Sequence, residues 1–287
     1  MKTPEPINPE TADQPAPLNA REEWTEFMKT ALIAVVLAML IRTFLYEPFN
    51  IPSSSMKPTL EIGDYLFVSK PAYGFSKHSF PLGLGLFEGR VMADGKVPQR
   101  GDVVVFYNDK TGQDYIKRVI GLPGDRVQVN DGQLYLNRQK VPREIIGLKK
   151  VREGDFEQVL TEYTQTLPEG AMFSIYEESD SRPLDNTEEF LVPAGHYFMM
   201  GDNRDNSQDS RVQSAVGFVP YDNLIGRASF IFFSTDGSAG LAEVWKWPFA
   251  IRYGRIFDSI DPVRPPQTPA SEKTTQGLTR DAHAAAP

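Results

Sequence analysis

The sequence predicts a mainly β protein: an antiparallel β-sheet domain with an inserted β subdomain, preceded by a single N-terminal transmembrane helix. Two observations predict this class. An apolar run lies near the N-terminus, and beyond residue 46 the chain consists of short apolar or alternating runs separated by turn residues. Because no long amphipathic helical period follows residue 46, we expect strands to supply the core.

Composition narrows the classes of function. The 287 residues carry a formal net charge of −8 and no sizeable cluster of Lys and Arg, which argues against a nucleic-acid surface. The absence of cysteine excludes disulfides, thiol nucleophiles and thiolate metal sites, and it is compatible with an exported domain. We expect neither a cofactor nor a metal ion.

Residues 23–46 are predicted to be an uncleaved membrane anchor. The strictly apolar run from Thr30 to Ile41 is short for a transmembrane helix, but its flanks extend it nearly to bilayer thickness. Trp24 and Tyr46 stand where interfacial aromatic residues are expected. The large residues that follow the run disfavour a removable signal peptide, whereas a buried soluble helix stays open as the alternative.

The remaining chain divides by composition. Residues 47–137 and 194–258 are predicted to form one β core, since most of the strand-like runs lie there. Residues 138–193 are more acidic and richer in turn residues, and are predicted to be an inserted β subdomain. Residues 1–22 and 259–287 have little to bury and are predicted to be disordered tails.

A serine-rich loop at residues 50–60 is the first chemical motif. Pro52 and Pro58 each fix the backbone and remove an amide donor, so the segment cannot be the interior of a helix or of a central strand. The three serines at 53–55 lie between apolar residues, which would present a hydroxyl against an apolar pocket. A serine-rich linker is the alternative, although linkers rarely interleave Ile, Met and Leu with serines.

The second motif is the predicted strand within residues 114–125. Strand alternation places Tyr115, Lys117 and Val119 on one face and sends Arg118 to the other. An ammonium beside an aromatic and a β-branched residue is partly desolvated, which lowers the pKa of the lysine and makes it a possible base. The alternative is a lysine that extends to solvent from a strand end.

The third motif is a polar loop at residues 201–211. Read from Asp205, its spacing partly imitates a calcium loop, but Ser210 occupies the position of the required glycine and the distal glutamate is missing. A rigid platform is the preferred interpretation, in which Arg204 and Arg211 pair with the acids of the loop.

In this order, the three motifs resemble the bacterial type I signal peptidases, which are membrane-bound serine endopeptidases. The resemblance covers about residues 40–130 and 195–235. Its most specific parts are Ser-Met-Lys-Pro-Thr-Leu, Asp-Tyr-Ile-Lys-Arg-Val-Ile-Gly-Leu-Pro-Gly-Asp and Gly-Asp-Asn-Arg-Asp-Asn-Ser-Gln-Asp-Ser-Arg. The resemblance implies a Ser/Lys dyad with Ser55 as the nucleophile and Lys117 as the general base.

The resemblance also assigns supporting roles. The hydroxyl of Ser53 and the backbone amide of Ser55 would form the oxyanion hole. Ser54 departs from the pattern, because many members of the family have glycine there, and it adds a second hydroxyl beside the nucleophile. Ser207 would orient the Lys117 amine, and Asp209 with Arg211 would brace the platform formed by residues 201–211.

The physical chemistry of the residues agrees with a Ser/Lys pair. A serine hydroxyl is a poor nucleophile until a base accepts its proton, and lysine can replace the histidine of a Ser-His-Asp triad. A competing triad would use His78, His196 or His283, none of which has a clear carboxylate partner nearby in sequence. Distance along the chain leaves that alternative open.

Apolar residues around the motifs predict shallow pockets that hold small side chains. Small residues at the first and third positions before the scissile bond are the A-x-A pattern of secretory signal peptides. The resemblance implies that this peptide binds extended, as an added strand at a sheet edge. The predicted lining residues are Phe49, Ile51, Pro52, Met56, Leu60, Tyr115 and Ile116.

The implied partners are signal-peptide-bearing preproteins and the lipid bilayer. The implied location is the bacterial inner (plasma) membrane, with a single pass, a cytoplasmic N-terminus and the β domain on the outer (periplasmic) side. An apolar loop at residues 75–87 and the aromatic residues Trp245, Trp247 and Phe249 are candidate membrane contacts, with packing on the core as the alternative. Two other functions stay open: a non-catalytic membrane-tethered domain that binds exported chains, and a related Ser/Lys protease that acts on itself or on a regulator.

Overall fold

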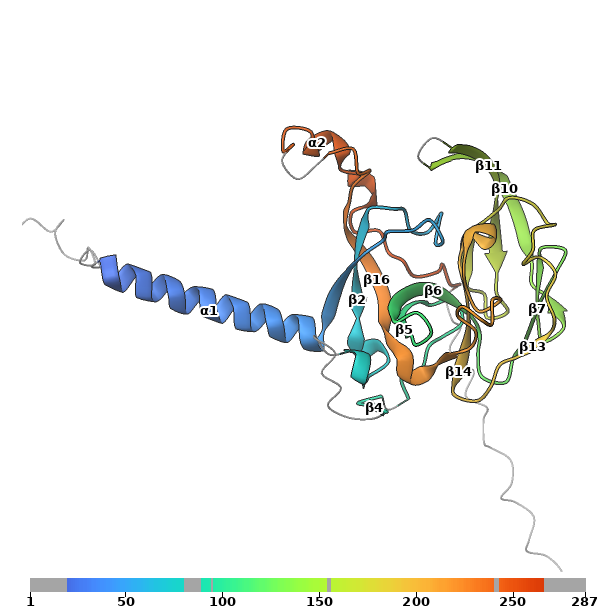
Figure 1. Ribbon diagram of the computed structural model, residues 1–287, viewed down its shortest axis with the longest axis horizontal. Coiled ribbons are helices and arrows are strands. Elements are labelled where there is room, and N and C mark those ends of the chain that lie inside the picture. The colour runs from blue at the N-terminus through green and yellow to red at the C-terminus, as the bar shows by residue number, and fades with distance from the viewer. Residues whose placement is uncertain (1–19, 80–88, 94, 154–155, 240–242, 266–287) are drawn as a thin grey trace, which may run out of the picture.

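The structure is a computed structural model that describes residues 20–79, 89–93, 95–153, 156–239 and 243–265. A long helix, α1 (Ala20–Phe44), projects from a body made of β-sheets (Figure 1). The fold is therefore mainly antiparallel β with one N-terminal apolar helix, as predicted. After α1, the described residues contain one further α-helix, α2 (Trp247–Ala250), which is a single short turn.

Helix α1 is an exposed apolar helix. The most apolar 18-residue window within residues 23–44 has a mean hydropathy of 1.9, and none of this window is buried against the rest of the protein. A buried soluble helix is thereby contradicted, because such a helix would pack its apolar side chains on a core. The helix is long enough to cross a bilayer, and it begins at Ala20, earlier than the predicted start at residue 23.

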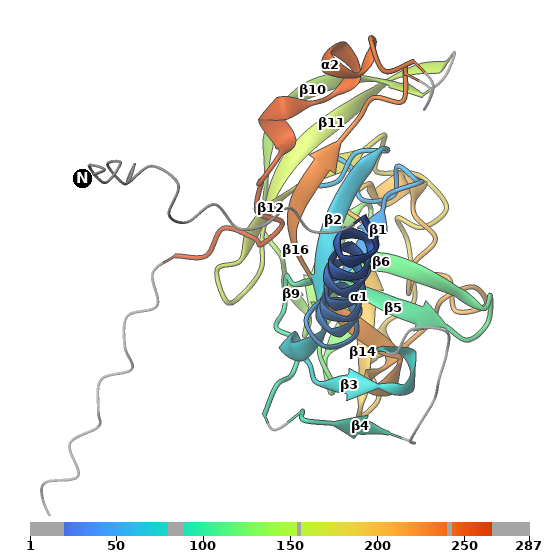
Figure 2. The same ribbon diagram turned by 90° about the vertical axis from the view of Figure 1, so that its left-hand side faces the viewer.

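The main sheet has seven strands in the order β1-β2-β16-β5-β6-β14-β15, and all neighbours are antiparallel. Figure 2 looks along α1 onto this sheet, with β1 directly behind the end of the helix. The strands are β1 (Tyr46–Asn50), β2 (Asp64–Ser69), β5 (Val103–Asn108), β6 (Gln113–Gly121), β14 (His196–Met200), β15 (Val219–Pro220) and β16 (Leu224–Ser234).

Strand β6 pairs with different neighbours along its two halves. Its six residues from Gln113 to Arg118 pair with β5, whereas β14 pairs with Arg118, Val119 and Gly121 alone. Among the described strands, the first half of β6 therefore has a free edge on the side of β14. A free edge exposes backbone N–H and C=O groups that can pair with another extended chain.

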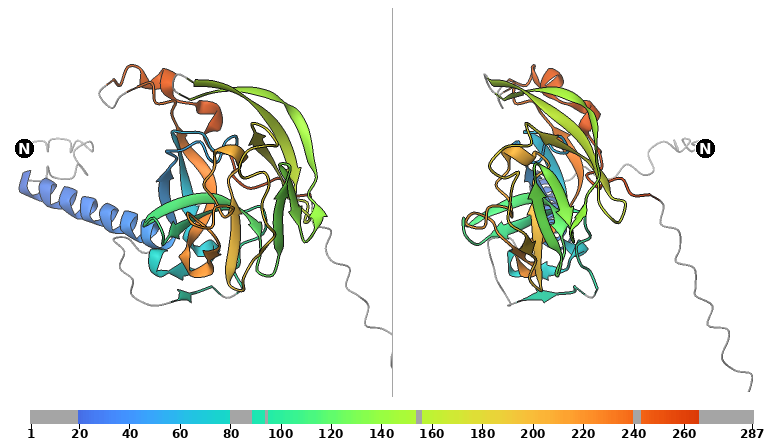
Figure 3. Two further views of the ribbon diagram at one scale, coloured as in Figure 1. Left: turned by 45° about the vertical axis from the view of Figure 1, so that its right-hand side comes forward. Right: turned by 90° about the vertical axis from the view of Figure 1, so that its right-hand side faces the viewer.

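Beyond the main sheet, the described residues form a four-stranded sheet, β13-β7-β8-β9, and a three-stranded sheet, β10-β11-β12. Strands β10 and β11 form a long ribbon that curves toward the end of the molecule where α2 lies (Figure 3). The bounds are β7 (Arg126–Asn130), β8 (Gln133–Leu136), β9 (Gln139–Lys140), β10 (Arg143–Glu153), β11 (Phe156–Thr166), β12 (Met172–Glu177) and β13 (Phe190–Leu191).

The predicted insertion at residues 138–193 contains β9 to β13. Its first and last strands belong to the four-stranded sheet, since β9 pairs with β8 and β13 pairs with β7. The boundaries of this insertion therefore stay a prediction. The smaller elements are β3 (Phe75–Ser76) and β4 (Arg90–Val91), which pair with each other, and the 3₁₀ turns η2 (Lys70–Ala72), η3 (Lys77–Ser79), η5 (Arg204–Asn206), η6 (Tyr221–Asn223) and η7 (Tyr253–Arg255).

The C-terminal boundary at residue 258 is wrong for the part of the tail that the structure describes. Ser259 bridges to Phe230, Ile260 is buried, and Val263 exchanges backbone hydrogen bonds with Met172. Ile260 packs into the core cluster beside β16, which a composition argument could not foresee. Residues 1–19 and 266–287 lie outside the described residues.

The candidate membrane contacts separate into two groups. Trp245 and Phe249 are 67% and 87% exposed and lie around α2, so they do not pack on the core. Phe75 is buried, and the other apolar residues of its predicted loop, which lie at positions 80–87, are outside the described residues.

Candidate active site

The serine loop at residues 50–60 connects β1 to β2 and is irregular, as predicted. Met56 and Leu60 are fully buried and pack with Leu66 of β2 in one apolar cluster. These two side chains hold the loop on the sheet, because removing them from the core would expose a large apolar area. Ser55, next to Met56 in this anchored loop, is only 8% exposed.

Strand β6 brings Lys117 to Ser55. The Lys117 Nζ donates to Ser55 Oγ at 2.8 Å and to the backbone oxygen of Ile116 at 2.9 Å. The same Nζ lies 5.7 Å from the centre of the Tyr115 ring, so the lysine and the tyrosine share a face as strand alternation predicts. The two polar side chains meet although 62 positions separate them in sequence.

The amine of Lys117 is shielded from solvent. Its side chain is 4% exposed, and burial lowers the pKa of Lys117 to about 8, although the charges of Asp209 and Asp202 oppose this shift. Burial has this effect because the ammonium form loses its hydration while the neutral amine loses little. About a tenth of Lys117 is therefore neutral at pH 7.

Arg118 points to the opposite side of β6. It binds Asp202 through two hydrogen bonds, from Nε at 2.7 Å and from a terminal nitrogen at 2.6 Å. Asp202 also accepts a hydrogen bond from Thr59 Oγ1 at 2.5 Å. This ion pair joins the serine loop, β6 and the 201–211 loop, and it neutralises the arginine charge beside Lys117.

The 201–211 loop is a rigid platform beneath the serines. Asp209 accepts hydrogen bonds from Arg211 Nε at 2.9 Å and from the backbone amide of Gly201 at 3.0 Å. These contacts and the Arg211 charge hold the pKa of the Asp209 carboxyl below its usual range despite burial. Arg204 differs from the sequence interpretation, since it donates to the Gly201 backbone oxygen and to Gln165 instead of an acid.

The platform contacts the serine loop directly. The backbone amide of Asn203 donates to the Ser55 backbone oxygen at 3.1 Å, and the Asn206 side chain donates to Ser54 Oγ at 2.8 Å. The extra hydroxyl of Ser54 thus accepts a hydrogen bond from a side-chain amide. Gly201 permits this approach, because a Cβ there would lie 2.5 Å from the Ser55 backbone oxygen.

Two further predicted site residues lie nearby. Ser53 Oγ is 3.3 Å from Ser55 Oγ. Ser207 is buried, and its hydroxyl lies close enough to Asp209 to help lower the pKa of that carboxyl, whereas no hydrogen bond joins it to Lys117. The predicted orientation of the Lys117 amine is supplied in this structure by the Ile116 backbone oxygen.

A cleft of about 650 Å³ opens over the two residues that form the Lys117–Ser55 contact. Five of the seven predicted lining residues border it, namely Phe49, Ile51, Pro52, Tyr115 and Ile116. The prediction for Met56 and Leu60 is wrong, because both lie in the core below the loop. Residues that the sequence reasoning missed are Asn50, Val105, Gln113, Asp114, Asn206 and Gln208.

Some of these missed residues carried a signal. Asn206 and Gln208 belong to the third motif and could have been found there. Val105 lies opposite Ile116 across β5 and β6, and only the strand register reveals that position.

The described histidines take no part in this arrangement. His78 stacks on Tyr107 with ring centres 4.3 Å apart, and His196 Nδ1 lies 2.9 Å from the Ala194 backbone oxygen at the surface. Neither is among the partners of Ser55 in the described part of the chain, and His283 lies outside it.

Comparisons with known proteins agree with the resemblance of the motifs. Residues 24–233 match the family model described as signal peptidase, peptidase S26. A signal peptidase I from Rickettsia conorii is 38% identical over 260 residues, which cover 84% of this chain and 93% of the relative. One from Rickettsia canadensis is 39% identical over 259 residues, which cover 83% of this chain and 93% of the relative.

A signal peptidase I of known structure from Enterococcus faecalis is 29% identical and covers 46% of this chain and 97% of that chain, with a TM-score of 0.28. The family match spans the serine loop, β6 and the platform, and the two Rickettsia relatives match over most of their own length. The chain therefore belongs to the peptidase S26 family of signal peptidases.

Proposed function

We propose that this chain is a membrane-anchored serine endopeptidase that removes N-terminal signal peptides from exported preproteins at A-x-A sites. The observation that carries the proposal is the 2.8 Å contact between a desolvated lysine amine and a serine hydroxyl at the floor of a largely apolar cleft. Family membership supports the reaction class. No cofactor enters the proposed mechanism.

In the proposed mechanism, Lys117 acts as the neutral amine. The contact with Ser55 then runs in the other direction, with the serine hydroxyl donating to the lone pair on Nζ. As Ser55 Oγ attacks the scissile carbonyl, its proton moves to Lys117, and the ammonium passes that proton to the leaving amine. Water then attacks the acyl ester with Lys117 again accepting the proton, which releases the peptide and restores Ser55.

The developing oxyanion would be stabilised by the Ser55 backbone amide and the Ser53 hydroxyl. Ser53 Oγ is 3.3 Å from Ser55 Oγ, close enough to reach an oxygen bonded to the attacked carbon after rotation of its side chain. Asp209 and Arg211 would hold the platform, and the buried Ser207 Oγ, with its hydroxyl directed at Asp209, would accept the remaining hydrogen of the Lys117 amine.

The free edge of β6 suggests how the substrate binds. Residues 113–117 line the cleft and lack a strand partner on the side of β14 among the described residues. An extended peptide could pair with this edge and place alternate side chains in the cleft. Ile51 and Ile116 border the cleft, and we expect the pockets beside them to be shallow, which would favour small residues at the first and third positions before the scissile bond.

The direct test is cleavage of a precursor. Purified full-length protein in detergent should cut a preprotein with an A-x-A site directly after the second alanine, as mapped by mass spectrometry. Ser55→Ala should abolish the cut while leaving the fold intact. A domain that only binds exported chains would keep its function in Ser55→Ala, and a self-directed protease would instead show a cut within its own chain.

We predict that the pH dependence of kcat/KM reports the Lys117 amine. Because burial lowers the pKa of Lys117 to about 8, activity should rise with pH and level off above that value. At pH 7 the expected rate is about one-tenth of the plateau, since only that share of the amine is neutral. The assay needs a substrate without titratable side chains near the cut, and an acid limb near the value of free lysine would contradict the assignment.

We also propose that α1 spans the inner membrane with the N-terminus in the cytoplasm, and that the α2 segment contacts the outer leaflet. Trp245 and Phe249 expose large apolar side chains beside Lys246, a combination typical of membrane interfaces. A chain that begins at Glu47 should therefore bind vesicles, as measured by co-sedimentation. Trp245→Ser with Phe249→Ser should weaken this binding by about tenfold or more, whereas equal binding by both proteins would refute the contact.

A further inference from the structure

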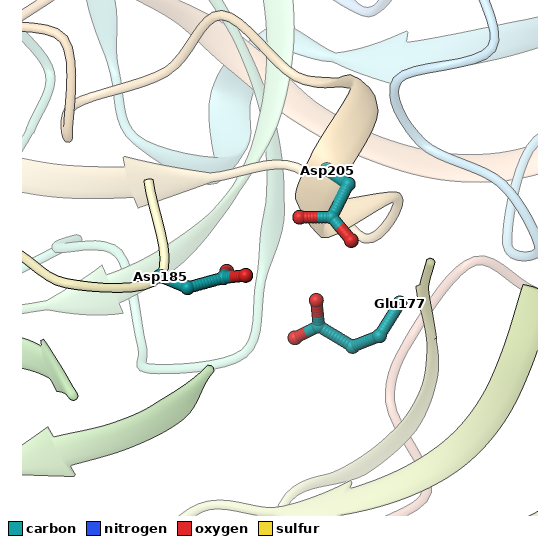
Figure 4. A group of neighbouring side chains, drawn as sticks. All are labelled: Glu177, Asp185 and Asp205. Atoms are coloured by element: carbon teal, nitrogen blue, oxygen red, sulfur yellow. The ribbon is translucent and has the colours of Figure 1, made fainter. Parts of the chain in front are cut away.

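Three carboxylates converge outside the cleft, on the far side of the platform. They are Glu177 at the end of β12, Asp185 in the turn that follows, and Asp205 in η5. One oxygen from each lies within 4.8 Å of the others, and Figure 4 shows the three carboxyl groups directed toward one another. Three segments of the chain thus bring three acids to one point.

Each of these carboxyl groups has a buried oxygen without a hydrogen-bond partner among the described residues: Glu177 Oε2, Asp185 Oδ1 and Asp205 Oδ1. Glu177 is 2% exposed and Asp185 is 1% exposed. A buried carboxylate oxygen with no donor is costly, so such oxygens are rare unless a ligand or ion satisfies them.

The other oxygens of two of these groups are fixed. Asp185 Oδ2 accepts the backbone amide of Arg182 at 2.6 Å, and Asp205 Oδ2 accepts the backbone amide of Glu178 at 2.7 Å. These contacts set the rotation of both carboxyl groups. These backbone hydrogen bonds therefore hold the free oxygens inward, just as hydrogen bonds to the ligands of a metal ion fix the orientation of those ligands.

The charges of Arg204 and Arg211 act on the cluster and oppose the rise in the pKa of Glu177, but burial outweighs them. Arg204 hydrogen-bonds to the Gly201 backbone oxygen and to Gln165, so it donates to none of the three free oxygens. Arg143 lies 3.5 Å from Glu177 Oε1, but its guanidinium hydrogen-bonds to Asp180 and to the Gly132 backbone oxygen. Arg211 is paired with Asp209. Burial accordingly raises the pKa of Glu177 to about 8 and also raises the pKa of Asp185.

We propose that Glu177, Asp185 and Asp205 bind one Ca²⁺ ion. Oxygen is the only donor present, which suits a hard cation and disfavours zinc or copper. Ligands of Ca²⁺ lie about 2.3–2.6 Å from the ion, so oxygens up to about 5 Å apart can share it, whereas the smaller Mg²⁺ needs a tighter set. Of the three acids, Asp205 alone borders a neighbouring cleft of about 610 Å³, so this residue lies between the cluster and that cleft.

This site differs from a linear calcium loop. Its ligands come from β12, from the turn after it and from η5, so the sequence spacing that starts at Asp205 does not describe it. The ion would stabilise η5 beneath the serine loop. In that turn Asn206 donates to Ser54 Oγ, and the preceding Asn203 donates to the Ser55 backbone oxygen.

Calorimetry and thermal unfolding of the full chain in detergent test the proposal. Titration with CaCl₂ should show saturable uptake of about one ion per chain. At about 100 times the dissociation constant, CaCl₂ should raise the unfolding midpoint by about 5 °C or more relative to EGTA. Asp185→Asn should lose the uptake and the shift, and Glu177→Gln provides a second variant in case the first does not fold.

The matched control is Glu188→Gln, which removes a charge from an exposed position in the same turn and should keep the full response. An absence of uptake by the parent chain, or equal uptake by Asp185→Asn, would overturn the proposal. A response to MgCl₂ as large as that to CaCl₂ would overturn the assignment to calcium. If Glu177 is protonated instead, CaCl₂ will not change the stability of the protein. The free energy of unfolding will then increase as the pH falls below about 8, because folding raises the pKa of Glu177.

Discussion

Lys117→Arg should lower kcat/KM by at least about 10⁴-fold, as much as Lys117→Ala does. The proposed base must offer a lone pair to Ser55 Oγ, which lies 2.8 Å from Nζ. A guanidinium keeps its proton at any pH at which the protein is folded, so it can preserve the positive charge but cannot accept a proton. Cleavage of the A-x-A precursor under single-turnover conditions measures the loss.

Two controls separate this effect from damage to the fold. Lys140→Arg makes the same chemical change at an exposed position on β9 and should leave activity unchanged. The double variant Ser55→Ala with Lys117→Ala should be hardly slower than either single variant, because the residues of a nucleophile and its base act as one unit. Substantial activity in Lys117→Arg, or fully additive losses, would refute the Ser/Lys dyad.

Asp202→Ala should lower the free energy of unfolding by about 3–5 kcal/mol. It removes both hydrogen bonds to Arg118, which is 1% exposed, and so leaves a guanidinium buried without a counter-charge. It also removes the acceptor for Thr59, which ties the serine loop to the platform. Chemical denaturation followed by circular dichroism measures the change.

An exposed ion pair provides the comparison. Glu157→Ala breaks the surface pair with Lys150 and should change stability by less than about 1 kcal/mol, since exposed pairs contribute little. Combining Asp202→Ala with Arg118→Met should recover part of the loss, because the unpaired charge is then gone. A loss from Asp202→Ala as small as that from Glu157→Ala would show that Arg118 finds another partner or water.

Much of the local structure could be predicted from patterns in the sequence. The length and hydropathy of residues 23–44 indicated an apolar helix, and the short alternating runs indicated strands. Strand alternation also placed Lys117 and Arg118 on opposite faces of β6, which the separate partners of the two side chains confirm. These features depend on the local backbone period, which neighbouring residues determine.

The chemical pair required a resemblance to a known family, because no local pattern links Ser55 to Lys117. Their contact depends on β6 passing beneath a loop that Met56 and Leu60 anchor in the core. Those two residues were predicted to line the pocket because they flank the serines. Flanking positions do not reveal which apolar side chains face the cleft and which face the core.

By itself, the sequence determined the apolar helix, the β character and the residue types available for chemistry. Only the tertiary structure decided which of these residues are desolvated and which charges face one another. The pKa of Lys117 falls to about 8 because strands distant in sequence remove water from its amine. Glu177, Asp185 and Asp205 form a cluster because β12, a turn and η5 converge, and burial and electrostatic coupling depend on such distances in space, which the order of residues does not encode locally.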